Sequence, residues 1–368
     1  METTNLNAIC PYFTMFPLDF PLGILESYSE VNQWVLDPFC GRGTTNFAAR
    51  IYNCPSIGID SSPVAVALTK AKLVNTKVDQ IVRAAKRILS SKTEPVVPDG
   101  EFWQHAFDKD VLISICKIRE ALLKRCDSET RVALRAIMLG ALHGPQSTNN
   151  PSYFSNQCPR TYAPKPAYAI KFWKERNLKP PKVDVLNIIK KRAERYYGQN
   201  LPEGCGFVIK GDSTTNLAFV KAKRILNKYD SKVKIIITSP PYYGMKTYIA
   251  DQWIRNWFLG GPDVVDYSTK SQIKHSSKEI FINELRKVWN NVCEISSCDA
   301  VLAIRFGAIN NRKVNPRDII TESLKGTVWE IEKISSAGFA KKGRRQADTF
   351  SNSNKEQIEE IDVIALKR

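Results

Sequence analysis

Short apolar runs rich in β-branched residues alternate along the chain with stretches in which apolar residues recur every three or four positions. The first pattern predicts buried strands and the second predicts amphipathic helices. We expect helices at 46–51 and 64–73. We expect strands, in chain order, at 33–36, 55–60, 206–210, 233–238 and 300–306, with an antiparallel edge pair at 328–334 and 361–366. This alternation predicts an α/β fold with a mostly parallel sheet.

A long segment separates the second and third expected strands. Residues 90–204 exceed the length of a simple crossover, and a stretch of that size inside a compact domain is usually functional or a separate module. The pattern is helical over 111–125 and 130–142 and is then broken repeatedly by proline. We therefore predict one domain from 1–90 and 205–368, and an inserted helical or irregular segment at 91–204. An irregular surface loop is expected at 341–354.

Composition narrows the class of protein. With 43% hydrophobic and 25% charged residues the chain falls in the globular range. It has neither an apolar run of about 18 residues nor a basic, apolar leader, so we expect no membrane span and no secretion. The net charge of +17 favours a polyanionic partner, although a basic surface without any such role is the alternative.

Cysteine and histidine usage indicates the compartment and argues against a metal site. The nine cysteines are odd in number and show no C-x-x-C spacing, and the three histidines are far apart in sequence. We expect reduced, mostly buried thiols in a cytoplasmic protein, and no bound metal.

The first expected strand runs into a glycine turn with the sequence DPFCGRGTT at 37–45. A strand, a glycine turn and a helix together place backbone N–H groups at the carboxyl edge of a sheet, where such folds bind ligands. Asn46 stands where the dinucleotide fingerprint needs its third glycine, which argues against a nicotinamide cofactor. Asp60 ends the next strand and could accept hydrogen bonds from ribose hydroxyls, or could simply cap the following helix.

A second motif, TSPPYYG at 238–244, follows the fourth expected strand. Two prolines after an apolar strand end its hydrogen-bond ladder and fix an extended turn at the same edge. By itself such a turn is as well explained by strand termination as by function.

Together the two motifs resemble those of the amino-methylating DNA methyltransferases, D-P-F-x-G-x-G-T-T and [DNS]-P-P-[YFW]. The segments GID at 58–60, GDS at 211–213 and PYFTMFP at 11–17 resemble further cofactor-contact segments of that family. The resemblance covers about 8–75 and 205–368. It implies a Rossmann-like, S-adenosylmethionine-dependent methyltransferase sheet, which the mainly helical insertion interrupts.

The resemblance also implies roles for individual residues. Asp60 would bind the ribose of the cofactor, and Asp212 with Ser213 would lie near its adenine. Ser239, Pro240, Pro241 and Tyr242 would form the catalytic turn, which holds a base flipped out of the duplex. The full set of expected cofactor-binding residues is Phe13, Asp37, Pro38, Phe39, Cys40, Gly41, Gly43, Thr44, Thr45, Asp60, Ser61, Asp212 and Ser213.

The motifs define the type of reaction more narrowly than they define the atom that is methylated. The S-P-P-Y form most resembles the cytosine-N4 group, with adenine N6 as the alternative. Here the cofactor motif precedes the catalytic motif, whereas many S-P-P-Y enzymes have the reverse order. Cytosine C5 methylation needs a Pro-Cys dipeptide, which the chain lacks. The motifs are also compatible with an RNA guanine-N2 methyltransferase, for which we expect an N-terminal RNA-binding domain, and with an inactive nucleic-acid-binding protein.

Double-stranded DNA is therefore the expected partner, and a separately acting cognate restriction endonuclease would be consistent with this role. Between Arg160 and Arg195 the chain carries eleven Lys and Arg residues against three acidic ones, with interleaved aromatics. A solvated helix with an aromatic core face is the alternative. Trp253 and Trp257, at i, i+4 spacing, are expected in a core. The candidate DNA-binding residues are Arg160, Lys165, Lys171, Lys190, Lys191, Arg192 and Lys246.

Overall fold

The computed structural model describes residues 2–12, 16–144, 152–158, 164–243, 250–267, 273, 277–307, 315–339 and 359–368. The chain forms two compact units, each described here by itself. The helical unit comprises Met1–Pro11, Val74–Leu201 and Thr247–Ser268, and the sheet unit comprises Tyr12–Leu73, Pro202–Lys246 and Thr269–Arg368. Compared with the division expected at residues 90 and 205, the segments 1–11, 74–90 and 247–268 group with the helical unit.

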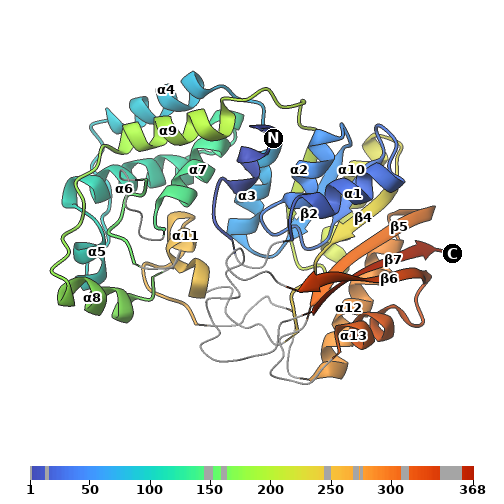
Figure 1. The fold of residues 1–368 in the computed structure, drawn as a ribbon. Helices are drawn as coiled ribbons and strands as arrows, with labels where there is room; N and C mark the ends of the chain where they lie inside the picture. Colours follow the sequence, from blue (N-terminus) through green and yellow to red (C-terminus); the bar gives the residue numbers. More distant parts are fainter. Residues whose placement is uncertain are drawn as a thin grey trace. The chain divides into compact units, whose positions relative to one another are not determined.

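The sheet unit is built on seven strands in the order β3-β2-β1-β4-β5-β7-β6 (Figure 1). The first five in this order are parallel, and β7 is antiparallel to both of its neighbours. The strands are β1 (Trp34–Asp37), β2 (Ser56–Asp60), β3 (Gly206–Lys210), β4 (Val233–Thr238), β5 (Ser296–Gly307), β6 (Trp329–Phe339) and β7 (Glu359–Lys367). The predicted α/β class and the antiparallel pair near one edge are both confirmed.

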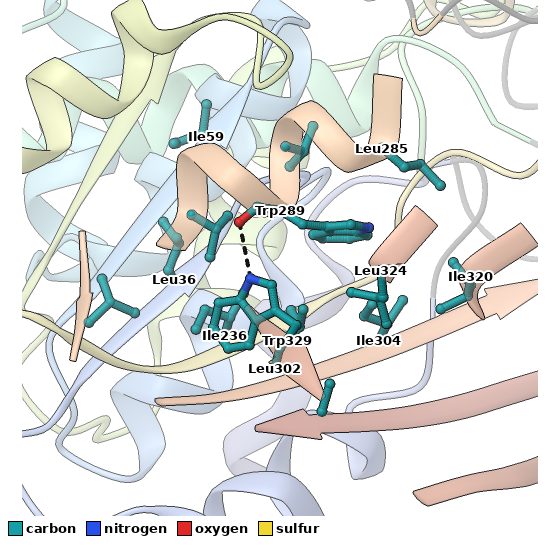
Figure 2. Close-up of a cluster of buried hydrophobic side chains, with 14 of the residues drawn as sticks. Leu36, Ile59, Ile236, Leu285, Trp289, Leu302, Ile304, Ile320, Leu324 and Trp329 are labelled. Carbon is teal, nitrogen blue, oxygen red and sulfur yellow. Dashed lines mark hydrogen bonds between the residues drawn. The ribbon is translucent and has the colours of Figure 1, made fainter. Parts of the chain in front are cut away.

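Helices cover the two faces of this sheet. One face carries a core from α1, α2, β1, β4 and β5, and the other a larger core from α10, α12 and α13. Figure 2 shows part of the larger core, where the Trp329 indole donates a hydrogen bond to the Trp289 carbonyl at 3.0 Å. The helices of this unit are α1 (Asp19–Tyr28), α2 (Thr44–Ile51), α3 (Pro63–Leu73), α10 (Asn216–Lys228), α12 (Lys278–Cys293) and α13 (Pro316–Leu324).

The strand order reverses direction between β1 and β4. From β1 the chain proceeds outward through β2 to β3, and it then returns to β4 on the other side of β1. In open α/β sheets ligands bind outside the carboxyl ends of the strands at such a switch point. The turns after β1 and β4 are the two motifs found in the sequence, so the topology brings both to the usual ligand-binding position.

The helical unit has its own core of aromatic side chains. Trp103 lies at the centre of this core, with its ring 5.8 Å from that of Trp253 and 4.4 Å from that of Trp257. Both Trp253 and Trp257 are buried, as predicted. The elements of this unit are the 3-10 segments Glu2–Ala8 and Ala250–Gln252 and the helices α4 (Val78–Leu89), α5 (Glu101–Ala106), α6 (Lys109–Lys124), α7 (Glu129–Ala141), α8 (Pro166–Glu175), α9 (Val185–Tyr197) and α11 (Trp253–Phe258).

Two whole-chain expectations can be compared with the structure. Within the described residues, none of the helices combines the length and the apolar character that crossing a bilayer requires. All nine cysteines are free thiols, five of them buried. The loop expected at 341–354 lies outside the described residues.

Candidate active site

Asp37 is the first residue of the cofactor motif and is fully buried at the end of β1. Its Oδ1 atom accepts hydrogen bonds from the Phe39 amide at 3.0 Å and the Thr238 hydroxyl at 2.7 Å. Its Oδ2 atom is also buried and has no hydrogen-bond partner among the described residues. Burial raises the pKa of Asp37 to about 6, while the hydrogen bonds from Thr238 and Phe39 oppose that rise.

Asp60, at the end of β2, holds the glycine turn in place. Its Oδ2 atom accepts a hydrogen bond from the Gly41 amide at 2.9 Å, and its Oδ1 atom accepts one from the Ser62 amide at 2.8 Å. Burial raises the pKa of Asp60 to about 6. Because each carboxylate oxygen can accept more than one hydrogen bond, these contacts leave capacity for ligand hydroxyls.

The two glycines of the turn have different surroundings, although both adopt positive φ. A Cβ on Gly41 would meet only Tyr12 and backbone at ordinary contact distances, the nearest being 3.6 Å. A Cβ on Gly43 would lie 2.7 Å from the Thr69 hydroxyl and 2.9 Å from the Thr69 Cα. A side chain at position 43 would therefore collide with Thr69 on α3. Position 43 is closed by α3, and only position 41 is open.

Hydrogen bonds join this turn to the neighbouring elements. The buried Thr45 hydroxyl donates to the Ile237 carbonyl on β4 at 3.1 Å. Ser213, expected near an adenine ring, donates its hydroxyl to the Pro38 carbonyl at 2.6 Å. The exposed Asp212 accepts hydrogen bonds from the amide and hydroxyl of Thr214. Among the other expected cofactor residues, Pro38, Cys40 and Thr44 are buried, and Phe39 and Ser61 are half-buried.

The catalytic motif begins where β4 ends at Thr238. Ser239 and Pro241 are half-buried and Pro240 is buried, and the Ser239 side chain makes no hydrogen bond to another described residue. Tyr242 is half-buried; its phenol donates a hydrogen bond to Glu360 Oε1 on β7 at 2.8 Å. The structure thus brings Asp37, Gly41, Asp60 and the 239–242 turn to the same edge of one sheet.

The remaining expected residues fall into two groups. Phe13, Arg160 and Lys246 lie outside the described residues. Lys165, Lys171, Lys190, Lys191 and Arg192 belong to the helical unit.

The basic residues of the helical unit differ in their contacts. The side chains of Lys171 and Lys190 are exposed and each is paired with a glutamate one helical turn further on, at 3.8 and 3.9 Å. Exposed pairs of this kind are weak and salt-sensitive. Lys165 and Lys191 are exposed and form no ion pair with a described residue. Arg192 instead donates two hydrogen bonds to the Ser152 carbonyl, at 3.1 and 2.7 Å.

The aromatic residues near these cations mostly pack in the core. Phe172, Trp173, Tyr196 and Tyr197 are buried, whereas Tyr168 is 55% exposed. Four of these five side chains therefore pack in the core, which agrees with the alternative of a solvated helix with an aromatic core face.

Three contact residues were missed by the sequence patterns. Thr238 is the first residue of the TSPPYYG motif but was not among the expected site residues. Thr69 lies inside an ordinary helical pattern, and Glu360 lies 118 positions from Tyr242. Only the folded sheet brings the last two to the site.

Comparison with known proteins supports the family of the motifs. Residues 2–71 match the model of the N6/N4 methyltransferase family, described as DNA methylase. Over residues 2–71 this match agrees with the family resemblance that the cofactor motif carries. No curated protein sequence matches the chain.

Solved structures give more distant likenesses. The rRNA methyltransferase aviRa from Streptomyces viridochromogenes is 11% identical, with 99% of this chain and 93% of that chain covered and a TM-score of 0.36. A Clostridium thermocellum protein described as a candidate rRNA methylase is 11% identical, with 96% and 100% covered and a TM-score of 0.33. SMU.776, a candidate methyltransferase complexed with SAH, is 8% identical, with 96% and 50% covered and a TM-score of 0.36.

Proposed function

We propose that this chain, whose residues 2–71 match the N6/N4 DNA methylase family, transfers a methyl group from S-adenosylmethionine to an exocyclic amine of DNA, with cytosine N4 as the favoured target. One observation carries the proposal. The Thr238 hydroxyl, next to Ser239, donates a hydrogen bond to Asp37 at 2.7 Å. This contact links the catalytic turn to the cofactor turn at the switch point of the sheet.

The residues around the β1 turn fit this cofactor. Asp37 carries a buried carboxylate oxygen that no described residue satisfies, which suits a cationic or hydrogen-bonding group of the methionine part. Gly41 leaves open the space that a Cβ would fill, and Asp60 has acceptor capacity for ribose hydroxyls. When bound, S-adenosylmethionine supplies an electrophilic methyl group on a sulfonium centre.

The catalytic turn suits activation of an amine. An exocyclic amine is a poor nucleophile because its lone pair is delocalised into the ring. In our proposal the Ser239 hydroxyl and the Pro240 carbonyl accept hydrogen bonds from its two N–H groups, which favours a pyramidal nitrogen with a localised lone pair. This is positioning together with electrostatic preorganisation. Tyr242 offers a ring face on which the flipped base stacks.

Cytosine N4 is favoured over adenine N6 because the motif carries Ser239 where many adenine enzymes carry aspartate. The basic residues of the helical unit, Lys165, Lys171, Lys190 and Lys191, are proposed to contact the DNA backbone. A cytoplasmic location and a role in a restriction-modification system, with a separate endonuclease, complete the proposal.

The test is direct identification of the product. We would express the chain in a host without amino-methylated DNA, digest the genomic DNA to nucleosides and measure N4-methylcytosine and N6-methyladenine by mass spectrometry. N4-methylcytosine is expected. N6-methyladenine alone would overturn the choice of base, and neither product, despite S-adenosylmethionine binding by the purified chain, would overturn DNA amino-methylation.

The Ser239→Ala variant tests the assignment of the catalytic turn. Turnover should fall far more than cofactor affinity, because the lost hydrogen bond matters chiefly when the amine attacks. Methylation at the parental rate would remove Ser239 from the catalytic residues. An inactive nucleic-acid-binding protein would bind DNA and leave both nucleosides unmodified.

A further inference from the structure

Glu360 is a carboxylate in an unusual place, at the start of β7 with only 4% of its surface exposed. In the antiparallel ladder it is the register partner of Gly307 at the end of β5. Burying a carboxylate is costly unless hydrogen bonds or opposite charges compensate for the lost hydration. Here one hydrogen bond comes from the Tyr242 phenol at 2.8 Å.

The Tyr242 ring is fixed from two further directions. It makes an edge contact with Phe306, with ring centroids 5.8 Å apart and planes at 73°. It also lies over Gly307, because a Cβ at that position would come within 3.0 Å of its Cε2 atom and 3.2 Å of its Cζ atom. The ring thus occupies the space that the missing side chain of Gly307 leaves, and its phenol is held by the residue paired with that glycine.

We infer that Glu360 is a positioning residue for the proposed methyl transfer, which it serves by fixing the orientation of the Tyr242 ring. This inference rests on the proposed function and adds a residue from outside both motifs. A tyrosine free to rotate presents its face to a flipped base only part of the time, and the ordering must then be supplied during binding. A ring held at its hydroxyl end and its edge is ordered beforehand, and small misplacements of reacting groups can cost about 100-fold in rate.

The test compares Glu360→Ala, Glu360→Gln and Tyr242→Phe in the full chain. Labelled S-adenosylmethionine and unmethylated genomic DNA are the substrates. Glu360→Ala removes the acceptor and should lower kcat by about tenfold or more, within the range for lost positioning, while the Kd for S-adenosylmethionine changes less than about twofold, since that ligand binds at the other turn. Glu360→Gln keeps an acceptor oxygen and should recover most of the rate.

A double-mutant cycle distinguishes positioning from general support of the sheet. If Glu360 acts through the phenol, Tyr242→Phe should lower kcat to a similar degree, and Glu360→Ala with Tyr242→Phe should be no slower than either single variant. Additive losses, or an unchanged kcat in Glu360→Ala, would overturn the inference.

Asp362→Asn is the matched control. It neutralises a carboxylate two residues further along β7, which pairs with Arg305 at 2.6 Å and not with Tyr242. If this variant reproduced the loss of kcat at unchanged cofactor affinity, the effect would belong to the strand and the inference would fail. If the parental enzyme binds no S-adenosylmethionine and modifies no DNA, the proposed function itself is overturned. If the parent is active and Glu360→Ala matches its kcat, only the inference about Glu360 fails.

Discussion

The Thr238 hydroxyl and the Asp37 carboxylate meet at 2.7 Å between β4 and β1, in positions 201 residues apart in sequence. Asp37 begins the cofactor motif and Thr238 the catalytic motif, so this hydrogen bond links the two turns directly, in addition to the Thr45 hydroxyl that donates to Ile237 on β4. Both residues are fully buried, which makes the hydrogen bond strong and its removal strongly destabilising.

Thr238→Val should uncouple the two turns with almost no change in side-chain shape. In this variant Oδ1 of Asp37 would accept only the hydrogen bond from the Phe39 amide. We expect a loss of about 1.5–3 kcal/mol in unfolding free energy, as for a hydrogen bond to a charged group, together with reduced methyl transfer. Urea unfolding and labelled-methyl transfer measure the two effects. Thr238→Ser, which keeps the hydroxyl, is the control, and equal behaviour of the two variants would contradict the assigned role.

Gly43→Ala and Gly41→Ala should separate folding from cofactor binding. A Cβ at position 43 would collide with Thr69 on α3, including its backbone, so this variant should lower the melting temperature strongly. At position 41 the space is open, and the cost is confined to the positive φ of 51°, about 1–2 kcal/mol. Gly41→Ala should therefore stay folded and bind S-adenosylmethionine more weakly. Calorimetric binding and thermal unfolding give the two readouts, and a Gly43→Ala protein as stable as the parent would contradict this placement.

The buried Asp37 predicts that stability falls as pH rises through the mildly acidic range. Its pKa rises from an ordinary value of 3.8 to about 6 in the folded chain, so the folded state binds more protons between these values. The stabilisation is fully present below pH 4 and is lost as the pH passes 6, up to about 3 kcal/mol. Urea unfolding at several pH values gives the unfolding free energy as a function of pH. The decrease of this free energy with rising pH should be smaller in Asp37→Asn than in the parent. The slope that remains belongs in part to Asp60, whose pKa is raised in the same direction. An identical slope in parent and variant would contradict the prediction.

Replacing Lys190 and Lys191 with alanine should weaken DNA binding on all sequences. The slope of log K against log salt is negative, and every phosphate that the variant no longer neutralises should reduce its magnitude by about 0.9. Arg192 is left intact because its two hydrogen bonds hold the Ser152 carbonyl, and its loss would disturb the helical unit. Lys109→Ala with Lys124→Ala, at the two ends of α6, is the control with the same change of charge and similar exposure. If both double variants have the same slope, residues 190 and 191 belong to a solvated face.

The sequence by itself determined the sheet and the two motifs. Strands β3 and β4 have the predicted bounds because each is a short apolar run bounded by turn residues. This local pattern suffices both for the buried central strand β4 and for the partly buried edge strand β3. The glycine and Pro-Pro turns could likewise be predicted from the sequence, because they depend on backbone preferences of the residues themselves. The core positions of Trp253 and Trp257 followed from their helical spacing.

Tertiary structure decided which residues the motifs contact. Thr69 closes the space beside Gly43, and Glu360 holds Tyr242, yet each lies in a segment with an ordinary helix or strand pattern. Arg192 appeared as one cation in a basic run, but the fold directs it to a carbonyl 40 positions away. Such contacts depend on strand order and side-chain packing, which bring together residues far apart in the chain. Local periodicity carries no information about those pairings, and only the folded sheet and helices supply it.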